Sequence, residues 1–309
     1  MVPSISCREC RTRRAVFSSS DLSRAKGQGI FGDARSSRRV LSLSDAAAQS
    51  LFATLLPSDC RLCQVPLTRI SRLPVCDDCL SRMEPIRGRV CAVCGERVIT
   101  SHAEAQPICG ECRTAAPPFV RAVANGSYDG GLRELTHLLK YDRVRPAAGV
   151  LGHMLAEAIQ GFGSEFISAV VVPVPLHASK LRERGFNQAE EIARAALKNL
   201  TSGGLTLSTG ILSRKRATES QTGLSDHQRE QNVRGAFVVT SPAAIAGEDV
   251  LLVDDVFTTG ATATECARVL RRAGADRVFV ATVARVLKAE AMGATPEEIE
   301  EPRTLKAYA

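Results

Sequence analysis

The stretch V-L-L-V-D-D-V-F-T-T-G-A-T, residues 250–262, decides the fold. Its first four residues are branched and apolar, as in a strand that is buried on both faces of a sheet. Two adjacent aspartates follow, then a turn rich in threonine and glycine, and a helix is expected over residues 262–273. A strand that leads through a short turn into a helix indicates a parallel α/β sheet. The turn then lies at the carboxyl edge, where open sheets of this kind bind ligands.

The turn and the two aspartates suit a sugar phosphate. Free N–H groups at the start of a helix, together with the helix dipole, favour a phosphate group, and threonine hydroxyls add donors. The predicted phosphate-binding residues are Thr258, Thr259, Gly260, Ala261 and Thr262. Asp254 and Asp255 would repel a phosphate but can accept hydrogen bonds from sugar hydroxyls, and two carboxylates at the end of a buried strand cost free energy unless they have a partner or a function. A ribose 5-phosphate offers both a phosphate for the turn and sugar hydroxyls for the aspartates.

Two other classes of phosphate site are excluded by the same stretch. A P-loop needs G-K-[ST] after its glycine-rich turn, and a dinucleotide site needs G-x-G-x-x-G, and neither pattern is present here.

The flanking sequence repeats the alternation of short apolar strands and helices. Strands are expected at residues 121–128, 169–174 and 277–284, and helices at residues 131–141, 146–162 and 187–200. We therefore expect a parallel sheet flanked by helices over residues 119–287. This domain begins after Pro117 and Pro118, because neither proline can continue a helix or donate to a sheet.

Ten of the eleven cysteines fall in five C-x-x-C pairs. Because the N-terminus lacks the apolar segment of a signal peptide, we interpret the pairs as metal ligands in a reducing cytoplasm and not as disulfides. Four regularly spaced pairs supply enough thiolates for two tetrahedral zinc ions: Cys60, Cys63, Cys76, Cys79, Cys91, Cys94, Cys109 and Cys112. The simplest pairing gives the first four to one ion and the last four to the other, although crossed pairing has the same composition. All-thiolate sites leave no open coordination position, so both ions are expected to be structural.

The N-terminal region divides into two parts. Residues 1–44 are expected to be a disordered basic extension, because they are rich in Ser, Arg and Gly and lack a hydrophobic period. An organelle transit peptide and a start codon placed too far upstream are the alternatives. Residues 45–118 are expected to contain the end of a short helix (residues 41–56) and the two zinc ribbons, and residues 288–309 a C-terminal tail. Cys7 and Cys10 are interpreted as an incidental pair, and His102 as a loop residue, with a zinc ligand as its alternative.

The net charge of +7 comes mainly from the N-terminal region, because residues 1–50 hold nine Lys or Arg against four acidic residues. The charge of the remaining chain therefore says little about partners. No apolar run is long enough to span a bilayer, so a soluble, cytoplasmic protein is expected.

Several motifs, in one order, resemble the ComF family of competence-associated proteins, also called the GntX-like or amidophosphoribosyltransferase-like family. Residues 250–262 look like the phosphoribosyl pyrophosphate-binding motif of type I phosphoribosyltransferases. The other matching stretches are the zinc-ribbon cysteines from Cys60, L-L-K-Y at 138–141, V-P-V-P-L-H at 172–177, R-E-R-G-F-N-Q-A at 182–189, L-S-R-K-R-A-T-E-S-Q-T-G-L-S at 212–225 and R-E-Q-N-V-R-G-A-F at 229–237. The resemblance covers residues 51–285 and implies a type I phosphoribosyltransferase fold preceded by a double zinc ribbon.

The resemblance also implies roles for single residues. Asp254 and Asp255 would be the catalytic pair, which holds the ribose hydroxyls and contacts the hydration shell of Mg²⁺, and the ion would balance the charge of the departing pyrophosphate. The basic residues after the strand at 169–174 would form the pyrophosphate loop, with a solvated basic loop as the alternative: Lys180, Arg182 and Arg184. Residues of the polar stretch before the motif would form a mobile loop that closes over the substrate: Arg214, Lys215, Arg216, Gln221 and Arg229.

Lys140 and Tyr141 end a helix in the small hood region, where such enzymes recognise the acceptor. An amphipathic helix end explains these two residues nearly as well. No role is expected for the remaining candidates, which are assigned to the core or the surface: His137, His153, His227 and Cys266.

Three functions stay open at this point. The first is a Mg²⁺-dependent phosphoribosyltransferase that binds phosphoribosyl pyrophosphate, or another ribose 5-phosphate ligand, and acts on an unidentified acceptor. The second, implied by the family, is a non-enzymatic competence factor that binds single-stranded DNA and works with the DNA-uptake machinery. The third is an interaction module built on the zinc ribbons. The intact phosphate loop favours the first, and the scarcity of aromatic residues among the basic ones is unlike a base-stacking platform.

Overall fold

The computed structural model describes residues 58–67, 69, 71–98, 106–163, 168–200, 204–217 and 225–288, all within one compact unit that spans Phe52–Ala309. The predicted basic extension, the helix expected at residues 41–56 and the tail beyond residue 288 lie outside these residues. So do four single residues of the sequence analysis, together with the side chain of His227: Cys7, Cys10, His102 and Gln221.

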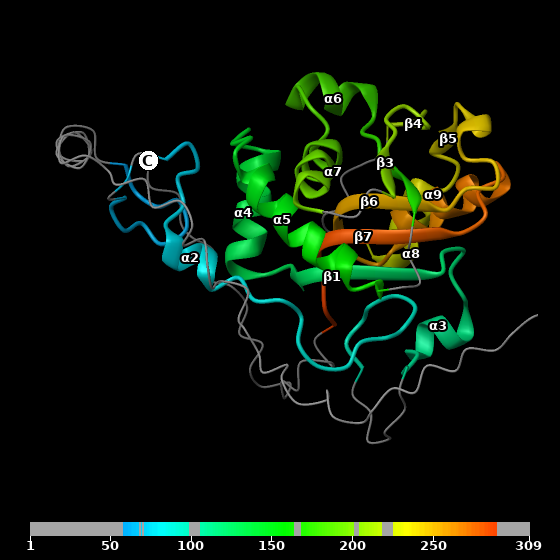
Figure 1. Ribbon diagram of the computed structural model, residues 1–309, viewed down its shortest axis with the longest axis horizontal. Coiled ribbons are helices and arrows are strands. Elements are labelled where there is room, and N and C mark those ends of the chain that lie inside the picture. Colours follow the sequence, from blue (N-terminus) through cyan, green and yellow to red (C-terminus); the bar gives the residue numbers. More distant parts are fainter. Residues whose placement is uncertain are drawn as a thin grey trace, which may run out of the picture. The chain divides into compact units, whose positions relative to one another are not determined.

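In the described part of the chain, five strands form one parallel sheet in the order β1-β7-β6-β2-β3 (Figure 1). They are β1 (Arg121–Ser127), β2 (Ala169–Pro173), β3 (Leu205–Leu207), β6 (Val250–Phe257) and β7 (Val278–Arg285). Every residue of β7 is buried, as are the first four residues of β6. The apolar runs of these two strands therefore have the composition that a central parallel strand requires, because helices cover it on both faces.

Helices pack on both faces of the sheet. The helices α5 (Ala147–Gln160) and α7 (Gln188–Asn199) share a core with Leu251 and Val253 of β6, whereas α9 (Ala261–Arg272) shares a second core with Val250 and Leu252. This division follows from the two-residue period of a strand. The helix α4 (Gly130–Lys140) joins the first core through its leucines, which recur every three or four residues.

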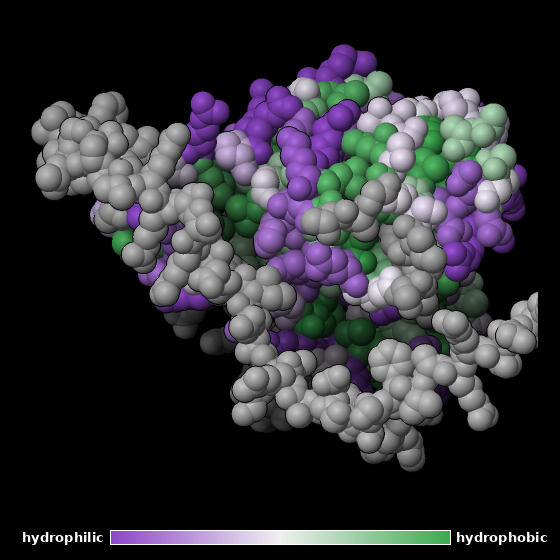
Figure 2. Space-filling view, in the orientation of Figure 1, coloured by the Kyte–Doolittle hydropathy of each residue, from purple (hydrophilic) through white to green (hydrophobic). Residues whose placement is uncertain are grey.

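Smaller elements complete the described part of the domain. The short helix α6 (Ala178–Arg184) follows β2, and an antiparallel pair is formed by β4 (Leu212–Arg214) and β5 (Phe237–Val239). The helix α8 (Asp226–Val233) precedes β5, and the 3₁₀ helix η2 (Pro242–Ala244) follows it. In Figure 2, hydrophilic side chains gather over α6 and α7. Among the described helices, none has both the length and the apolar character that a membrane span requires.

The predicted parallel sheet flanked by helices is confirmed, and each strand and helix predicted between residues 121 and 284 is found within a few residues of its expected bounds. Three local predictions need correction. The strand β6 continues to Phe257, because Asp254, Val256 and Phe257 pair with β7, so both aspartates lie within the strand. The basic residues expected in a pyrophosphate loop, Lys180, Arg182 and Arg184, lie on α6. The stretch expected as one mobile loop places Arg214 on β4 and Arg229 on α8.

Candidate functional site

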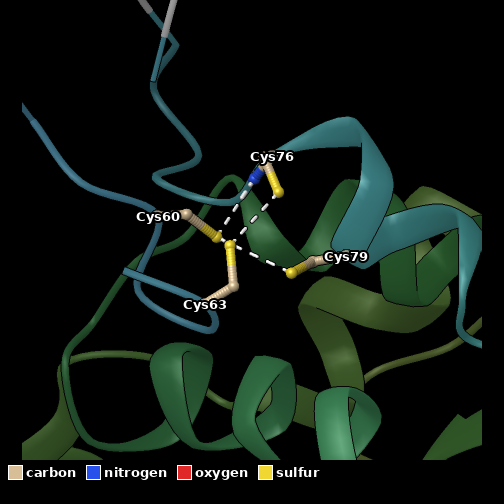
Figure 3. Close-up of side chains that lie close together, drawn as sticks. All are labelled: Cys60, Cys63, Cys76 and Cys79. Carbon is tan, nitrogen blue, oxygen red and sulfur yellow. Dashed lines mark hydrogen bonds between the residues drawn. The ribbon is translucent and has the colours of Figure 1, made fainter. Parts of the chain in front are cut away.

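The first zinc ribbon brings four cysteine sulfurs within 4.8 Å of one another (Figure 3). Cys60 and Cys63 lie on a tight turn, while Cys76 precedes and Cys79 lies on the short helix α2 (Asp77–Ser81). The Sγ atoms of Cys60 and Cys79 are 3.9 Å apart, and those of Cys63 and Cys76 are 3.7 Å apart. A tetrahedral zinc ion with Zn–S bonds of about 2.3 Å separates its sulfurs by roughly 3.8 Å. The four thiols therefore fit a structural zinc ion.

The second ribbon repeats this geometry. The four sulfurs of Cys91, Cys94, Cys109 and Cys112 also lie within 4.8 Å of one another, and the short helix α3 (Gly110–Thr114) takes the place of α2. In both ribbons the residue after the second cysteine is left-handed: Gln64 has a φ of 62° and Gly95 a φ of 74°. The sequential pairing, which the sequence left open against a crossed one, is the pairing found.

Backbone N–H groups in both ribbons favour the thiolate form that zinc requires. The N–H of Cys76 lies 3.3 Å from the Sγ of Cys60, and the N–H of Cys109 lies 3.3 Å from the Sγ of Cys91. Burial raises the pKa of both acceptor thiols, but the N–H donors outweigh it, so that the pKa of Cys60 falls to about 6 and that of Cys91 to about 7. Each ribbon thus holds one thiol that ionises readily before the metal binds.

Zinc stoichiometry tests the independence of the two ribbons. We expect about two zinc ions per purified chain and about one in Cys112→Ser, because a tetrahedral thiolate site that loses one ligand binds zinc far more weakly. Elemental analysis of the desalted protein measures the ratio. The matched control is Cys266→Ser, since Cys266 is buried on α9, outside both clusters, and this variant should keep both ions. Loss of both ions in Cys112→Ser would show that the ribbons depend on each other.

A buried ion pair connects α4 to the end of β6. The Nζ of Lys140, the last residue of α4, contacts the Oδ2 of Asp255, and their side chains are 16% and 6% exposed. The backbone N–H of Asp255 donates to the Oδ1 of Asp254 at 2.9 Å. In the sequence, acceptor recognition and a plain helix end explained Lys140 nearly equally well, because its partner lies far away in the chain. The structure thus adds an ammonium group to the two predicted carboxylates.

The pKa values of the neighbouring Asp254 and Asp255 carboxyls are shifted in opposite directions. Burial and the Asp255 charge raise the pKa of Asp254 well above its usual range. Burial acts on Asp255 in the same direction, but the Lys140 ammonium outweighs it and lowers the pKa of Asp255. The pKa of Lys140 rises in turn, because the attraction of Asp255 exceeds the effect of burial. Of the two carboxyls, Asp255 is therefore the one that ionises more readily.

Three rings flank Lys140. The hydroxyl of Tyr128 lies 3.1 Å from the Nε2 of His137, whose ring meets that of Tyr141 edge-on with centroids 5.2 Å apart. Burial raises the pKa of Tyr128 and lowers that of His137, so both are neutral near pH 7. The guanidinium of Arg184 lies 5.9 Å from the centroid of the Tyr141 ring. His137, which the sequence assigned to the core or surface, thus belongs to this hood.

The phosphate loop is shaped by Gly260, which has a φ of +81° and caps α9. A Cβ at this position would lie 2.6 Å from the Cζ of Phe257, so the ring sits directly under the loop. The N-cap of α9 is this glycine, which has no side chain of its own, and the N–H of Ala261 donates to the Oγ1 of Thr259 at 3.4 Å. The loop therefore leads into the N-terminus of a helix, the end at which N–H groups and the helix dipole favour a phosphate.

The remaining basic candidates fall into two groups. Arg184 lies close enough to Asp255 to lower its pKa, and Arg214, whose pKa burial lowers, interacts with Asp254. Arg216 instead donates to the carbonyl oxygens of Asn232 and Arg234, at 2.9 and 3.1 Å, and so holds the end of α8. On the exposed face of α6, the Nζ of Lys180 bonds to the Oε2 of Glu183 at 2.8 Å. Of these candidates, Arg184 and Arg214 therefore interact with the carboxylates.

Comparison with known proteins assigns both parts of the chain. Residues 51–114 match the double zinc ribbon domain, and residues 181–302 match the phosphoribosyl transferase domain. The chain is 32% identical to the DNA utilization protein YhgH of Salmonella typhimurium, over 75% of this chain and 99% of that protein. It is 30% identical to competence protein F of Haemophilus influenzae, over 57% of this chain and 78% of that protein. It is 28% identical to competence protein ComFC of Bacillus subtilis, over 65% of this chain and 79% of that protein.

Proposed function

Because this chain belongs to the ComF family, in which a double zinc ribbon precedes a phosphoribosyltransferase domain, we propose that the carboxyl edge of its sheet binds phosphoribosyl pyrophosphate, or another ribose 5-phosphate ligand, with Mg²⁺. One observation carries the proposal. Two adjacent carboxylates and a left-handed glycine at a helix N-terminus lie within seven residues on β6 and the turn after it. A 5-phosphate and a vicinal diol on one sugar need this combination of N–H donors and acceptors.

Different residues of the proposed site would bind different parts of the ligand. The backbone of the phosphate loop, residues 258–262, would bind the 5-phosphate, and its three threonines would add hydroxyl donors. Asp254 and Asp255 would accept hydrogen bonds from the ribose hydroxyls. Lys140 would keep Asp255 ionised and fixed, because an ion pair within a buried site restricts the carboxylate to one orientation.

The same carboxylates fit Mg²⁺. Magnesium prefers oxygen ligands and is usually held by one or two carboxylates plus substrate phosphates and water. Asp254 and Asp255 are adjacent oxygen donors, and Lys140 already balances the charge of Asp255. When bound, the ion would neutralise charge on the pyrophosphate group. Arg184, which interacts with Asp255, and Arg214, which interacts with Asp254, would bind the remaining phosphate oxygens.

Calorimetric titration of phosphoribosyl pyrophosphate with Mg²⁺ into the zinc-loaded chain tests the proposal. We expect saturable binding that the variant Asp254→Asn/Asp255→Asn weakens at least about tenfold, since a hydrogen bond to a charged group contributes about 1.5–3 kcal/mol. The matched control is Asp249→Asn. Asp249 is an ion-paired carboxylate just before the other end of β6, and this variant should bind like the wild type. Absence of binding to the wild-type chain would exclude the proposed site.

A second candidate function is binding of single-stranded DNA during DNA uptake, without turnover. The names of the relatives, a DNA utilization protein and two competence proteins, favour it. Both functions can use one scaffold, because a sugar-phosphate pocket and a nucleic-acid surface need not overlap. Transformation assays separate them: a naturally competent strain that loses this gene and still takes up DNA normally would exclude the second function.

A further inference from the structure

Arg285, the last residue of β7, is a buried arginine that reaches the second zinc ribbon. Its Nη1 donates to the carbonyl oxygen of Cys94 at 2.6 Å, and its Nη2 donates to the Oε2 of Glu96 at 2.7 Å. The same Nη2 lies 3.8 Å from the Sγ of Cys94, one of the zinc ligands. Arg285 and Glu96 are only 4% and 5% exposed, so this guanidinium relies on the ribbon for its partners.

The other side of the guanidinium faces the phosphate loop. Its Cζ lies 4.5 Å from the centroid of the Phe257 ring, a cation–π distance, and the two residues are direct neighbours in the pairing of β6 and β7. The tip of that ring occupies the space where a Cβ of Gly260 would be. Cys94, Arg285, Phe257 and Gly260 therefore form one continuous series of contacts from the zinc cluster to the loop.

We propose that Arg285 is a positioning residue that couples zinc occupancy of the second ribbon to the conformation of the phosphate loop. The zinc ion holds the turn of residues 91–95, and this turn supplies the carbonyl oxygen that Arg285 binds. Without the ion the turn is no longer fixed, and the guanidinium that supports the Phe257 ring loses its anchor. The inference rests on the proposed function, because the loop must bind a phosphate for the coupling to change an affinity.

Coupling of this kind is reciprocal by thermodynamic linkage. If zinc in the second ribbon strengthens ligand binding, then ligand in the loop must strengthen zinc binding by the same factor. A purely structural arginine would change stability without linking the two affinities. Retention of zinc in the presence of ligand is therefore the property that distinguishes coupling from support of the fold.

The chain offers a matched control at the opposite end of the same two strands. Arg277, just before β7, donates through its Nε to the Oδ1 of Asp249 at 2.9 Å, and its Cζ lies 5.2 Å from the centroid of the Phe279 ring. The chemistry is that of Arg285, an arginine between a carboxylate and an aromatic ring. Its position is at the amino end of the sheet, away from the loop and the ribbon.

The experiment uses the full chain loaded with zinc, with ribose 5-phosphate as the probe. Calorimetry measures its affinity, and transfer of zinc to a chromogenic chelator is followed with and without the probe. We expect Arg285→Met to bind the probe about tenfold more weakly and to lose the slowing of zinc release that the probe causes in the wild type. Arg285→Lys, which keeps the charge, should recover part of both effects, and Arg277→Met should show neither.

A second variant keeps the test decisive if Arg285→Met does not fold. Cys112→Ser empties the second ribbon and should lower the affinity for ribose 5-phosphate by a similar factor. Wild-type affinity in either variant, or unchanged zinc protection in Arg285→Met, would overturn the coupling while leaving the proposed site intact. Failure of the wild-type chain to bind the probe would instead overturn the proposed site, and the coupling with it.

Discussion

Lys140→Met is expected to lower the free energy of unfolding by about 3–5 kcal/mol at pH 7, because it leaves the charge of Asp255 buried without a partner. The ammonium and the carboxylate are both largely removed from water, so solvent cannot replace the lost contact. Urea unfolding followed by circular dichroism measures the difference.

The pH dependence of this loss has a defined sign. In the wild type the pKa of Asp255 is lowered, so its contribution is complete above the unfolded-state pKa of about 4 and fades as the pH falls through the folded-state pKa. Without Lys140, burial would be the largest remaining influence and would raise that pKa, and stability would then fall as the pH rises through the new value. The deficit of Lys140→Met should therefore be largest near neutral pH and small near pH 4.

The double variant Lys140→Met/Asp255→Asn is the control for this interpretation. It removes both charges together, and replacing a buried ion pair by neutral groups costs far less than breaking it. We expect the double variant to regain most of the lost stability and to lose the pH dependence. A deficit that is equal at pH 4 and pH 7, or a double variant no more stable than the single one, would show that Lys140 acts through packing of its methylene groups.

Gly260→Ala is expected to weaken binding of phosphoribosyl pyrophosphate by about 100-fold, the scale on which a 1 Å misplacement acts. Two effects combine at this position. A left-handed conformation costs a non-glycine residue about 1–2 kcal/mol, and the new Cβ would lie 2.6 Å from the Phe257 ring. Because the ring is held by Arg285 and by the core, the loop must move instead, and its N–H groups move with it.

Gly274→Ala is the matched control for this loss of affinity. Gly274 also has a positive φ, of +104°, but a Cβ there would meet only Ala246, at 3.6 and 3.8 Å, which are ordinary contact distances. Both variants should lose thermal stability, because each places a side chain at a positive φ, whereas only Gly260→Ala should lose ligand affinity. Thermal melts measure the stability of both variants, and titrations measure their affinity for phosphoribosyl pyrophosphate. Equal affinity in the two variants would show that Gly260 is not part of the binding site.

The large elements were predictable because their signals are local. The branched apolar runs of β2, β6 and β7 and the leucine period of α4 need no knowledge of the rest of the chain. The zinc pairs were predictable for the same reason, although only the folded geometry distinguishes sequential from crossed pairing. In each case the signal lies within the element itself or in residue types that specify a metal ion.

The errors occur where tertiary contacts outweigh local preference. Aspartate is unfavourable in strands, so β6 was expected to end at Val253, yet pairing with β7 carries it to Phe257. The helix α6 has no apolar period, and its signals were the boundary residues, His177 as N-cap and Gly185 in a left-handed C-cap. The partners of Lys140 and Arg285 lie too far away in the chain for any pattern to indicate them.

The pairing of β1 with β7 has a consequence for folding during synthesis. Thr282 on β7 donates to the carbonyl oxygen of Val123 on β1 across 159 positions of the chain, and Arg285 reaches Cys94 across 191. A ribosome adds roughly 5–20 residues per second, so Arg285 is synthesised about 10–40 s after Cys94 of the second ribbon. During that interval β1 has no strand beside it and offers an open edge to other nascent chains. Translation speed through residues 200–285 should therefore control the yield of folded protein more strongly than translation speed through the ribbons.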